Sequence, residues 1–368
     1  MLDNVSVGTR PERRVAGALD ANIVALATAV PPKSIGQEEL KKRVIQFYPQ
    51  FAHMESIYSN TGIDRRYYVE NEEWYVFPHS WEERTASFQR YALDLLEEVA
   101  LGALDQADLR PDQIDALVVQ STTGLAVPSL DAMLMNRLAF SPQVERLPMF
   151  GLGCGGGVAG LTRASRIAST MPGGNVLFLT VELCTLCARI NDQKAAAFVS
   201  GALFGDGAAG VILRSGDSPD ASRTRAPLGR IRAGGEHFWG DTEYIMGWDV
   251  KNDGFGVVLS AELPSLVENR FADALDTFLE RVGMRKRDFA GYMFHPGGAK
   301  VLDAVERVLK LPAGGLRSSR ETLRTYGNMS SPTALFVLKE TVDSGDRGRH
   351  LLGAFGPGFS AYFAVIDL

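Results

Sequence analysis

The stretch from Phe150 to Gly160 carries one cysteine, Cys154, within a run of glycines. An apolar segment precedes it and small residues at helical spacing follow it, so we expect a strand, a sharp turn and a helix. Cys154 would stand on the turn, beside the positive end of the helix, which lowers a cysteine's pKa and favours the thiolate. Glycines there would let backbone and substrate approach closely. The pattern predicts that Cys154 is a nucleophile.

A nucleophilic thiol needs a proton acceptor and a group that holds developing oxyanion charge. Of the five histidines, His295 differs because it ends an apolar strand pattern and precedes Pro296-Gly297-Gly298, which opens a helix. The carboxyl ends of strands are where α/β sheets carry their sites, so His295 is the candidate base. Asn328, taken alone, is a loop residue or a helix cap. It gains a role only as an amide donor next to Cys154 and His295.

Two other patterns allow different chemistry. Gly151-x-Gly153-x-x-Gly156 matches a dinucleotide fingerprint, and Glu182 ends the next strand as a ribose-binding acid would. However, a thiol occupies the turn, and the motif follows other α/β elements, so we do not favour nicotinamide binding. Cys184-x-x-Cys187 fits a redox or zinc pair, but the chain has no second pair to complete a zinc site. We expect these two cysteines to be small residues that line a cavity.

Strand and helix patterns alternate around these residues. Strands are expected at 22–30, 116–120, 147–152, 175–181 and 208–214, and helices at 37–48, 85–107, 129–138, 154–170 and 194–200. This alternation predicts a mainly parallel sheet with helices on both faces. Residues 1–20 are charged and aperiodic, which indicates a loose arm.

A polar break at 215–229 separates a second series that repeats the first. Strands are expected at 231–233, 256–260, 292–295, 351–355 and 361–366, and helices at 264–282, 298–309 and 331–341. The sequence therefore predicts two related α/β halves. We place them at residues 1–220, with the cysteine, and 221–368, with His295 and Asn328.

Composition excludes several classes of protein. The 368 residues are 45% hydrophobic and 22% charged, as in ordinary globular proteins. The net charge is −6 and the sequence has no block of basic residues, so nucleic acid is not an expected partner. We expect no integral membrane segment, since no apolar run approaches the ~20 residues of a membrane span, and no signal peptide, since the N-terminus lacks its pattern. Three cysteines make no disulfide framework, so a cytoplasmic setting is expected.

Taken together, Cys154, His295 and Asn328 resemble the site of the type III polyketide synthases, the chalcone synthase-like family. The resemblance runs from about residue 23 to the end of the chain. It rests on five motifs in order: Gly151-Leu152-Gly153-Cys154-Gly155-Gly156-Gly157, Ala202-Leu203-Phe204-Gly205-Asp206-Gly207-Ala208-Ala209, His295-Pro296-Gly297-Gly298, Gly327-Asn328-Met329-Ser330-Ser331 and Gly356-Pro357-Gly358-Phe359.

The resemblance implies an α/β thiolase fold with a duplicated five-layer α/β/α/β/α core, a homodimer, and iterative condensation of malonyl-CoA onto an acyl-CoA starter. It implies that Cys154 carries the acyl group, that His295 pairs with its thiolate, and that His295 and Asn328 bind the malonyl thioester carbonyl. Two fixed donors suit the enolate that decarboxylation leaves. CoA thioesters would be substrates, with no metal and no other cofactor. Phe204 matches the phenylalanine that promotes loss of the malonyl carboxylate.

Several positions depart from the plant members of the family. The second, gating phenylalanine of the family matches Val257, and Phe255 nearby could partly replace it. Other cavity positions match Thr122, Val127, Cys184, Cys187, Trp248 and Ser330. The basic residues that hold CoA phosphates in plants match His53, Ser56 and Asn60, so Lys300 and Arg65 or Arg66 are the alternatives for that contact.

The segments Ser121-Thr122-Thr123-Gly124 and Val181-Glu182-Leu183-Cys184 are similar to bacterial members, above all alkylresorcinol and alkylpyrone synthases. That similarity implies a medium-chain or long-chain fatty acyl starter, which the apolar positions 127, 248 and 257 suit. Three alternatives stay open: a small or aromatic starter, malonyl-CoA alone, or a single-round ketoacyl synthase-like enzyme. The final glycine-rich motif and the Phe204 motif argue against the last. A non-catalytic dimer on the same fold would have no reason to keep Cys154, His295 and Asn328.

Overall fold

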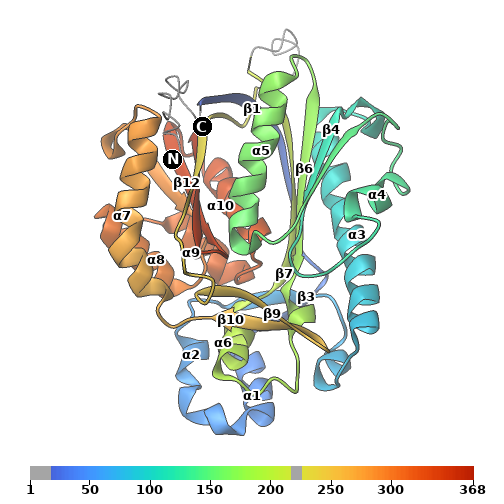
Figure 1. The fold of residues 1–368 in the computed structure, drawn as a ribbon, viewed down its shortest axis with the longest axis vertical. Helices are drawn as coiled ribbons and strands as arrows, with labels where there is room; N and C mark the ends of the chain where they lie inside the picture. Colours follow the sequence, from blue (N-terminus) through green and yellow to red (C-terminus); the bar gives the residue numbers. More distant parts are fainter. Residues whose placement is uncertain (1–17, 217–225) are drawn as a thin grey trace, which may run out of the picture.

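The computed structural model describes residues 18–216 and 226–368 (Figure 1). Residues 1–17 of the predicted arm lie outside the described residues, and residues 18–20 belong to a strand rather than to an arm. The predicted boundary between residues 220 and 221 also lies outside the described residues. Within the described ranges, no helix combines the length and the apolar character needed to cross a membrane.

A nine-stranded sheet runs through the molecule in the order β11-β12-β13-β8-β1-β7-β6-β4-β5. Its strands are β1 (Ala18–Ala29), β4 (Ala116–Gln120), β5 (Glu145–Met149), β6 (Asn175–Leu183), β7 (Asp206–Ser215), β8 (Gly229–Phe238), β11 (Gly291–Phe294), β12 (Arg349–Gly356) and β13 (Ser360–Asp367). Every residue of β4 and β6 is buried, as their continuous apolar sequences predict.

The expectation of a mainly parallel sheet is wrong. Only the pairs β4–β5, β4–β6 and β11–β12 are parallel, whereas the five pairs that involve β1, β7, β8 and β13 are antiparallel. The reason is visible between β6 and β7. The chain leaves the sheet at Leu183 and returns at Asp206, which pairs with Leu183. Helix α6 (Ala195–Leu203) therefore lies on an excursion beyond the end of the sheet and is not a crossover between parallel strands.

Five layers result from the way helices cover the two halves of this sheet (Figure 1). Helices α5 (Gly156–Thr170) and α10 (Ser331–Asp343) lie in the centre, in one core cluster with strands of both halves. On the outer faces, α3 (Trp81–Ala107) and α4 (Leu130–Met135) cover the first half, and α7 (Leu263–Arg281) and α8 (Ala299–Leu309) cover the second. A Cβ at Gly157 would lie 2.2 Å from the carbonyl oxygen of Ser331, so glycine permits the close contact of α5 with α10.

The two halves repeat one another in order and in space. The first half runs β1, α3, β4, α5, β6, β7, and the second runs β8, α7, β11, α10, β12, β13. The sheet order places β4, β6, β7 and β1 on one side of the centre and β11, β12, β13 and β8 in mirrored order on the other. This confirms the predicted duplicated α/β/α/β/α core.

A smaller layer covers the end of the sheet that carries the site. It contains α1 (Gln37–Phe47), α2 (Ser56–Ser59) and α6, the pair β2 (Lys33–Gly36) and β3 (Arg65–Tyr68), and the hairpin of β9 (Met246–Lys251) and β10 (Gly254–Leu259). Neither β9 nor α9 (Arg317–Tyr326) was expected. Strand β9 is at most half-buried, so its sequence does not alternate clearly between apolar and polar residues. Helix α9 buries Ser318, Ser319 and Thr322 with a single leucine, so it lacks the apolar residues at helical spacing that would predict it.

Candidate active site

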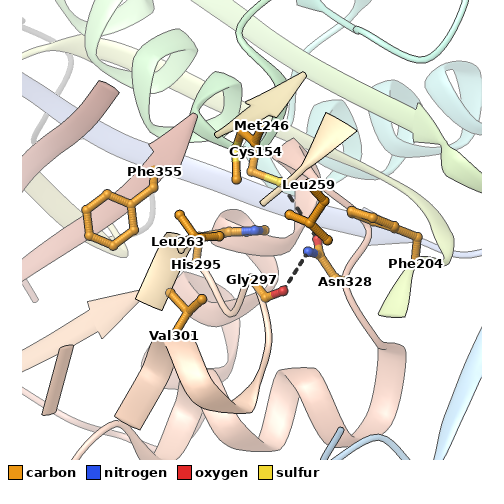
Figure 2. Close-up of a pocket in the computed structure, with 10 residues that line it drawn as sticks. All are labelled: Cys154, Phe204, Met246, Leu259, Leu263, His295, Gly297, Val301, Asn328 and Phe355. Atoms are coloured by element: carbon orange, nitrogen blue, oxygen red, sulfur yellow. Dashed lines mark hydrogen bonds between the residues drawn. The ribbon is translucent and has the colours of Figure 1, made fainter. Parts of the chain in front are cut away.

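Cys154, His295 and Asn328 come from distant parts of the chain and line one pocket (Figure 2). Cys154 lies on a 3₁₀ turn between β5 and α5, His295 directly follows β11, and Asn328 links α9 to α10. Phe204, directly after α6, lines the same pocket. The structure therefore brings together the four residues that the sequence analysis placed in the reaction.

The turn that carries Cys154 is held by its surroundings on both sides. The N–H of Gly153 donates to Oγ1 of Thr122 at 3.1 Å. A Cβ at Gly153 would lie 2.7 Å from Pro357, and a Cβ at Gly155 would lie 2.3 Å from Tyr362. Only glycine at these two positions lets Pro357 and Tyr362 pack against the turn. Of the three glycines of the nucleotide fingerprint, Gly153 is explained by this packing, and a Cβ at Gly156 would lie 2.4 Å from Nε2 of Gln120, whereas Gly151 has a positive φ of 86° and a Cβ there would have no atom within 4 Å.

Asn328 is oriented by hydrogen bonds at both ends of its amide. Its Oδ1 accepts from the backbone N–H of Ser330 at 2.8 Å, and its Nδ2 donates to the carbonyl of Gly297 at 3.2 Å. The Cys154 Sγ lies 4.0 Å from Oδ1. Since an amide nitrogen has two hydrogens, one Nδ2 hydrogen is left for a substrate oxygen.

His295 is buried, and neither ring nitrogen has a hydrogen-bond partner within the described part of the chain. Its backbone is fixed, because its N–H donates to the carbonyl of Gly353 at 2.8 Å. Figure 2 shows a ring nitrogen directed toward the space between Cys154 and Asn328. A buried imidazole without a protein partner is costly unless a ligand supplies the missing hydrogen bond.

Burial determines the resting protonation of the pair. It raises the pKa of the Cys154 thiol to about 11, although hydrogen bonds with Ser330 and Asn328 act in the opposite direction. It also lowers the pKa of the His295 imidazole to about 3. The expectation that the helix N-terminus leaves Cys154 with a lowered pKa is therefore wrong for a lone thiol in this pocket, because desolvation is the larger effect.

Glu182 belongs to a fully buried hydrogen-bond network and not to a nucleotide site. Its Oε2 accepts from the N–H of Thr122 at 2.9 Å and from Oγ1 of Thr123 at 2.8 Å, and its Oε1 accepts from Oγ of Ser331 at 2.9 Å. Burial raises the pKa of its carboxyl group. Because Thr122 also binds the turn at Gly153, the network connects the supports of Cys154 with the start of α10.

Cys184 and Cys187 are free thiols on a 3₁₀ turn after β6. The Cys187 Sγ donates to the carbonyl of Thr123 at 3.5 Å. Across residues 18–216 and 226–368, no group of three or more His, Cys, Asp or Glu side chains is arranged to hold a metal ion. We therefore interpret both cysteines as small residues in the wall of a cavity, and not as a metal or redox pair.

The predicted cavity residues fall into distinct places. Trp248 donates from Nε1 to the carbonyl of Thr122 at 3.0 Å and lies opposite Val257 in the β9–β10 hairpin. Ser330 and Cys184 are buried close to Cys154, and Cys187 lines a second cavity with Phe255 and Thr123. Sequence reasoning missed five apolar residues of the Cys154 pocket: Met246, Leu259, Leu263, Val301 and Phe355. The first two could have been found by alternation from Trp248 and Val257.

Val127 is not brought to the pocket of its own chain. Its side chain is 96% exposed and protrudes just before Pro128, on the connection that follows β4. Leu125, 46% exposed, precedes it on the same connection.

The positions considered for CoA phosphates differ in exposure. Lys300, on the first turn of α8, is exposed, and so are Arg65, His53, Ser56 and Asn60. A Cβ at Gly62 would lie 3.9 Å from the Cβ of Ala299, so the segment before β3 lies beside the start of α8. Arg66 is 2% exposed and binds backbone carbonyls, which excludes it as a phosphate contact.

Comparisons with known proteins agree on one family. Residues 9–217 match the N-terminal domain, and residues 230–365 the C-terminal domain, of the chalcone and stilbene synthases. A 1,3,6,8-tetrahydroxynaphthalene synthase from Streptomyces peucetius is 37% identical over 99% of this chain and 97% of its own length. The acylalkylpyrone synthase csyB from Aspergillus oryzae is 28% identical over 94% of both chains.

Solved structures agree with this result. The 1,3,6,8-tetrahydroxynaphthalene synthase from Streptomyces coelicolor, a bacterial type III polyketide synthase, superimposes with a TM-score of 0.87 at 29% identity, over 94% of this chain and 99% of that one. CsyB complexed with CoA-SH gives a TM-score of 0.86 at 26% identity, over 94% and 99% of the two chains. These likenesses confirm the thiolase fold.

Proposed function

The chain belongs to the chalcone and stilbene synthase family, the type III polyketide synthases, and from that premise we propose that it extends an acyl-CoA starter with malonyl-CoA. The starter would be carried on Cys154 and lengthened by repeated decarboxylative condensation, and the product released by cyclisation to an alkylpyrone or alkylresorcinol. One observation carries the proposal: Cys154, His295 and Asn328 line the same pocket. There the imidazole of His295 has no hydrogen-bond partner among the described residues, and the amide of Asn328 has one hydrogen left for a substrate.

Loading begins with attack of the Cys154 sulfur on the starter thioester. The thiol proton passes to His295, the new acyl–sulfur bond forms, and the CoA thiolate departs with that proton. Because burial disfavours a lone thiolate and a lone imidazolium, the two charges can arise only together, each compensating the other. The helix N-terminus of α5 adds to the stabilisation of the sulfur's negative charge.

Extension uses His295 again, now together with Asn328, to stabilise a different charge. The malonyl thioester carbonyl would accept hydrogen bonds from the His295 ring N–H and from the free Nδ2 hydrogen of Asn328. Loss of CO2 leaves an enolate whose oxygen these donors stabilise, and its carbon attacks the Cys154 thioester. The Cys154 thiolate leaves and is free to receive the lengthened chain. The apolar ring of Phe204 disfavours the carboxylate and so favours its loss.

The coupling of Cys154 and His295 predicts a pH effect on alkylation. In the wild-type enzyme an imidazolium at His295 can form together with the thiolate, whereas in His295→Ala burial acts on the thiol without a compensating cation, so the apparent pKa of Cys154 should be higher in the variant. Alkylation by iodoacetamide at neutral pH should slow by about tenfold for each unit of that rise. The rate–pH profile of Cys154 alkylation, read by intact-protein mass, measures the shift. Superimposable profiles for the two proteins would show that His295 does not stabilise the thiolate.

A fatty acyl starter is supported by the character of the walls. Met246, Leu259, Leu263, Val301 and Phe355 give the Cys154 pocket an apolar surface. The second cavity adds the rings of Trp81, Phe88 and Phe255 beyond Cys187. We expect a screen from acetyl-CoA to palmitoyl-CoA, with mass analysis of products, to show highest turnover for medium-chain or long-chain starters. Preference for a small aromatic starter would exclude the fatty acyl proposal.

The alternative is that the enzyme uses malonyl-CoA alone. It is favoured by the 37% identity to a synthase whose product, 1,3,6,8-tetrahydroxynaphthalene, carries no alkyl chain. The same screen separates the two. Equal product formation with malonyl-CoA alone and with added fatty acyl-CoA would support the alternative.

We also propose a homodimer in a reducing, cytoplasmic setting, where all three cysteines stay free. Since Val127 protrudes from its own chain, it can line a cavity only by reaching that of a second copy. The exposed apolar side chains of Leu125, Leu147 and Phe150 lie on the same half and would be covered in such a pair. A mass of two chains by light scattering supports this arrangement, and a single-chain mass contradicts it.

A further inference from the structure

Arg66, on β3, is a buried cation without a carboxylate partner among the described residues. It is 2% exposed, and burial lowers its pKa to about 10. Its Nη1 donates to the carbonyl of Gly201 at 2.5 Å and, more weakly, to that of Phe204 at 3.4 Å, and its Nη2 donates to Oε1 of Gln37. A buried charge held only by neutral groups costs stability.

These contacts gather at the carboxyl end of α6, where a helix presents unpaired carbonyls and a negative dipole. Arg66 takes the carbonyl of Gly201, and Nε2 of Gln37 takes that of Ala202 at 3.0 Å. The carbonyl of Leu203 accepts from the backbone N–H of Asn328 at 2.9 Å. One cluster therefore holds the end of α6 and connects it to a residue of the pocket.

Phe204 and Asn328 are joined directly at this place. They form an isolated parallel bridge, in which the N–H of Gly205 donates to the carbonyl of Asn328 at 2.9 Å. A Cβ at Gly205 would lie 3.3 Å, and a Cβ at Gly327 3.4 Å, from the Cβ of Arg66. Arg66 thus packs against both glycines that flank the bridge, while its guanidinium fixes the helix end that supplies one side of it.

We propose that Arg66 is a positioning residue for the malonyl half of the reaction, which sets Phe204 and Asn328 relative to one another through the end of α6. The inference rests on the proposed function. The proposal predicts that replacing Arg66 affects the two halves of the reaction differently. Because the cluster around Arg66 does not include the turn of Cys154, the replacement should impair decarboxylation much more than the reactivity of the Cys154 thiol. A lysine cannot replace it fully, because a point charge cannot hold several acceptors in the geometry of the planar guanidinium.

The test compares Arg66→Gln and Arg66→Lys with the wild-type enzyme by two rates and one stability measurement. We expect malonyl-CoA decarboxylation to fall about a hundredfold in kcat for Arg66→Gln, since small misplacements have effects of that size, and to fall less for Arg66→Lys. Alkylation of Cys154 by iodoacetamide should fall far less than decarboxylation, because the long contact of Asn328 with the sulfur affects the pKa of the thiol much less than burial does. The thermal midpoint reports the general loss of stability.

Arg214→Gln is the matched control. Arg214 lies near the far end of β7, and its Nε donates to an amide oxygen, Oδ1 of Asn175, at 2.5 Å. This variant should lower the thermal midpoint without changing decarboxylation. Unchanged decarboxylation in both Arg66 variants, or a parallel fall in decarboxylation and alkylation in Arg66→Lys, would overturn the proposal. Absence of decarboxylation in the wild-type enzyme would instead overturn the proposed function.

Discussion

Cys154→Ala forms no product from acyl-CoA and malonyl-CoA, because no other group in the pocket can carry the growing chain. The variant should also show no acyl adduct by intact-protein mass after incubation with the starter. Cys184 and Cys187 act as internal controls. Burial raises the pKa of both thiols, and the charge of Arg84 near Cys187 offsets this only in part, so neither should take up the acyl group.

The same variant separates loading from decarboxylation. His295 and Asn328 are unaltered in it, so malonyl-CoA should still lose CO2 and give acetyl-CoA. Full product formation by Cys154→Ala would show that the chain is not carried on this residue. An acyl adduct on Cys184 or Cys187 would transfer the nucleophilic role to another thiol.

Replacing either donor of the proposed enolate site has the second large effect. Asn328→Ala and His295→Ala should each lower malonyl-CoA decarboxylation by about a hundredfold to a thousandfold, the usual loss when one oxyanion donor is removed. The effect should appear in kcat, because the enolate charge exists only after the carboxylate begins to leave. Single-turnover release of CO2 from malonyl-CoA measures it.

His350 offers a control of the same residue type. It is buried on β12, and its Nδ1 lies 3.1 Å from the carbonyl of Gly348, away from the pocket. His350→Gln should decarboxylate malonyl-CoA at the wild-type rate. Undiminished decarboxylation in both the Asn328 and the His295 variants would remove the two residues from this step.

Much of the fold could be predicted, because local patterns determine it. The fully buried strands β4 and β6 read as apolar runs, and the glycine-rich segment predicted the strand, turn and helix around Cys154. His295 could be found because it follows an apolar strand and precedes a glycine pair. The direction of β7 could not be found in this way, since a helix between two strands is present both in a crossover and in an excursion such as α6.

The site was harder to predict where it depends on distant contacts. Nothing local distinguishes Asn328 or Phe204 from ordinary loop residues, and only the family resemblance selected them. The raised pKa of Cys154 follows from burial, which a turn motif does not show. Arg65 and Arg66 are neighbours in sequence, yet alternation along β3 exposes one and buries the other. The exposure of Val127 depends on how the connection after β4 folds.

The central claim is that an acyl chain on Cys154 grows by decarboxylative addition of two-carbon units. The most direct measurement is mass analysis of products from decanoyl-CoA and malonyl-CoA labelled with carbon-13 at the methylene position. The account predicts products that contain the decanoyl chain and one labelled two-carbon unit for each CO2 released. Consumption of both substrates without any product heavier than the starter acid would contradict it.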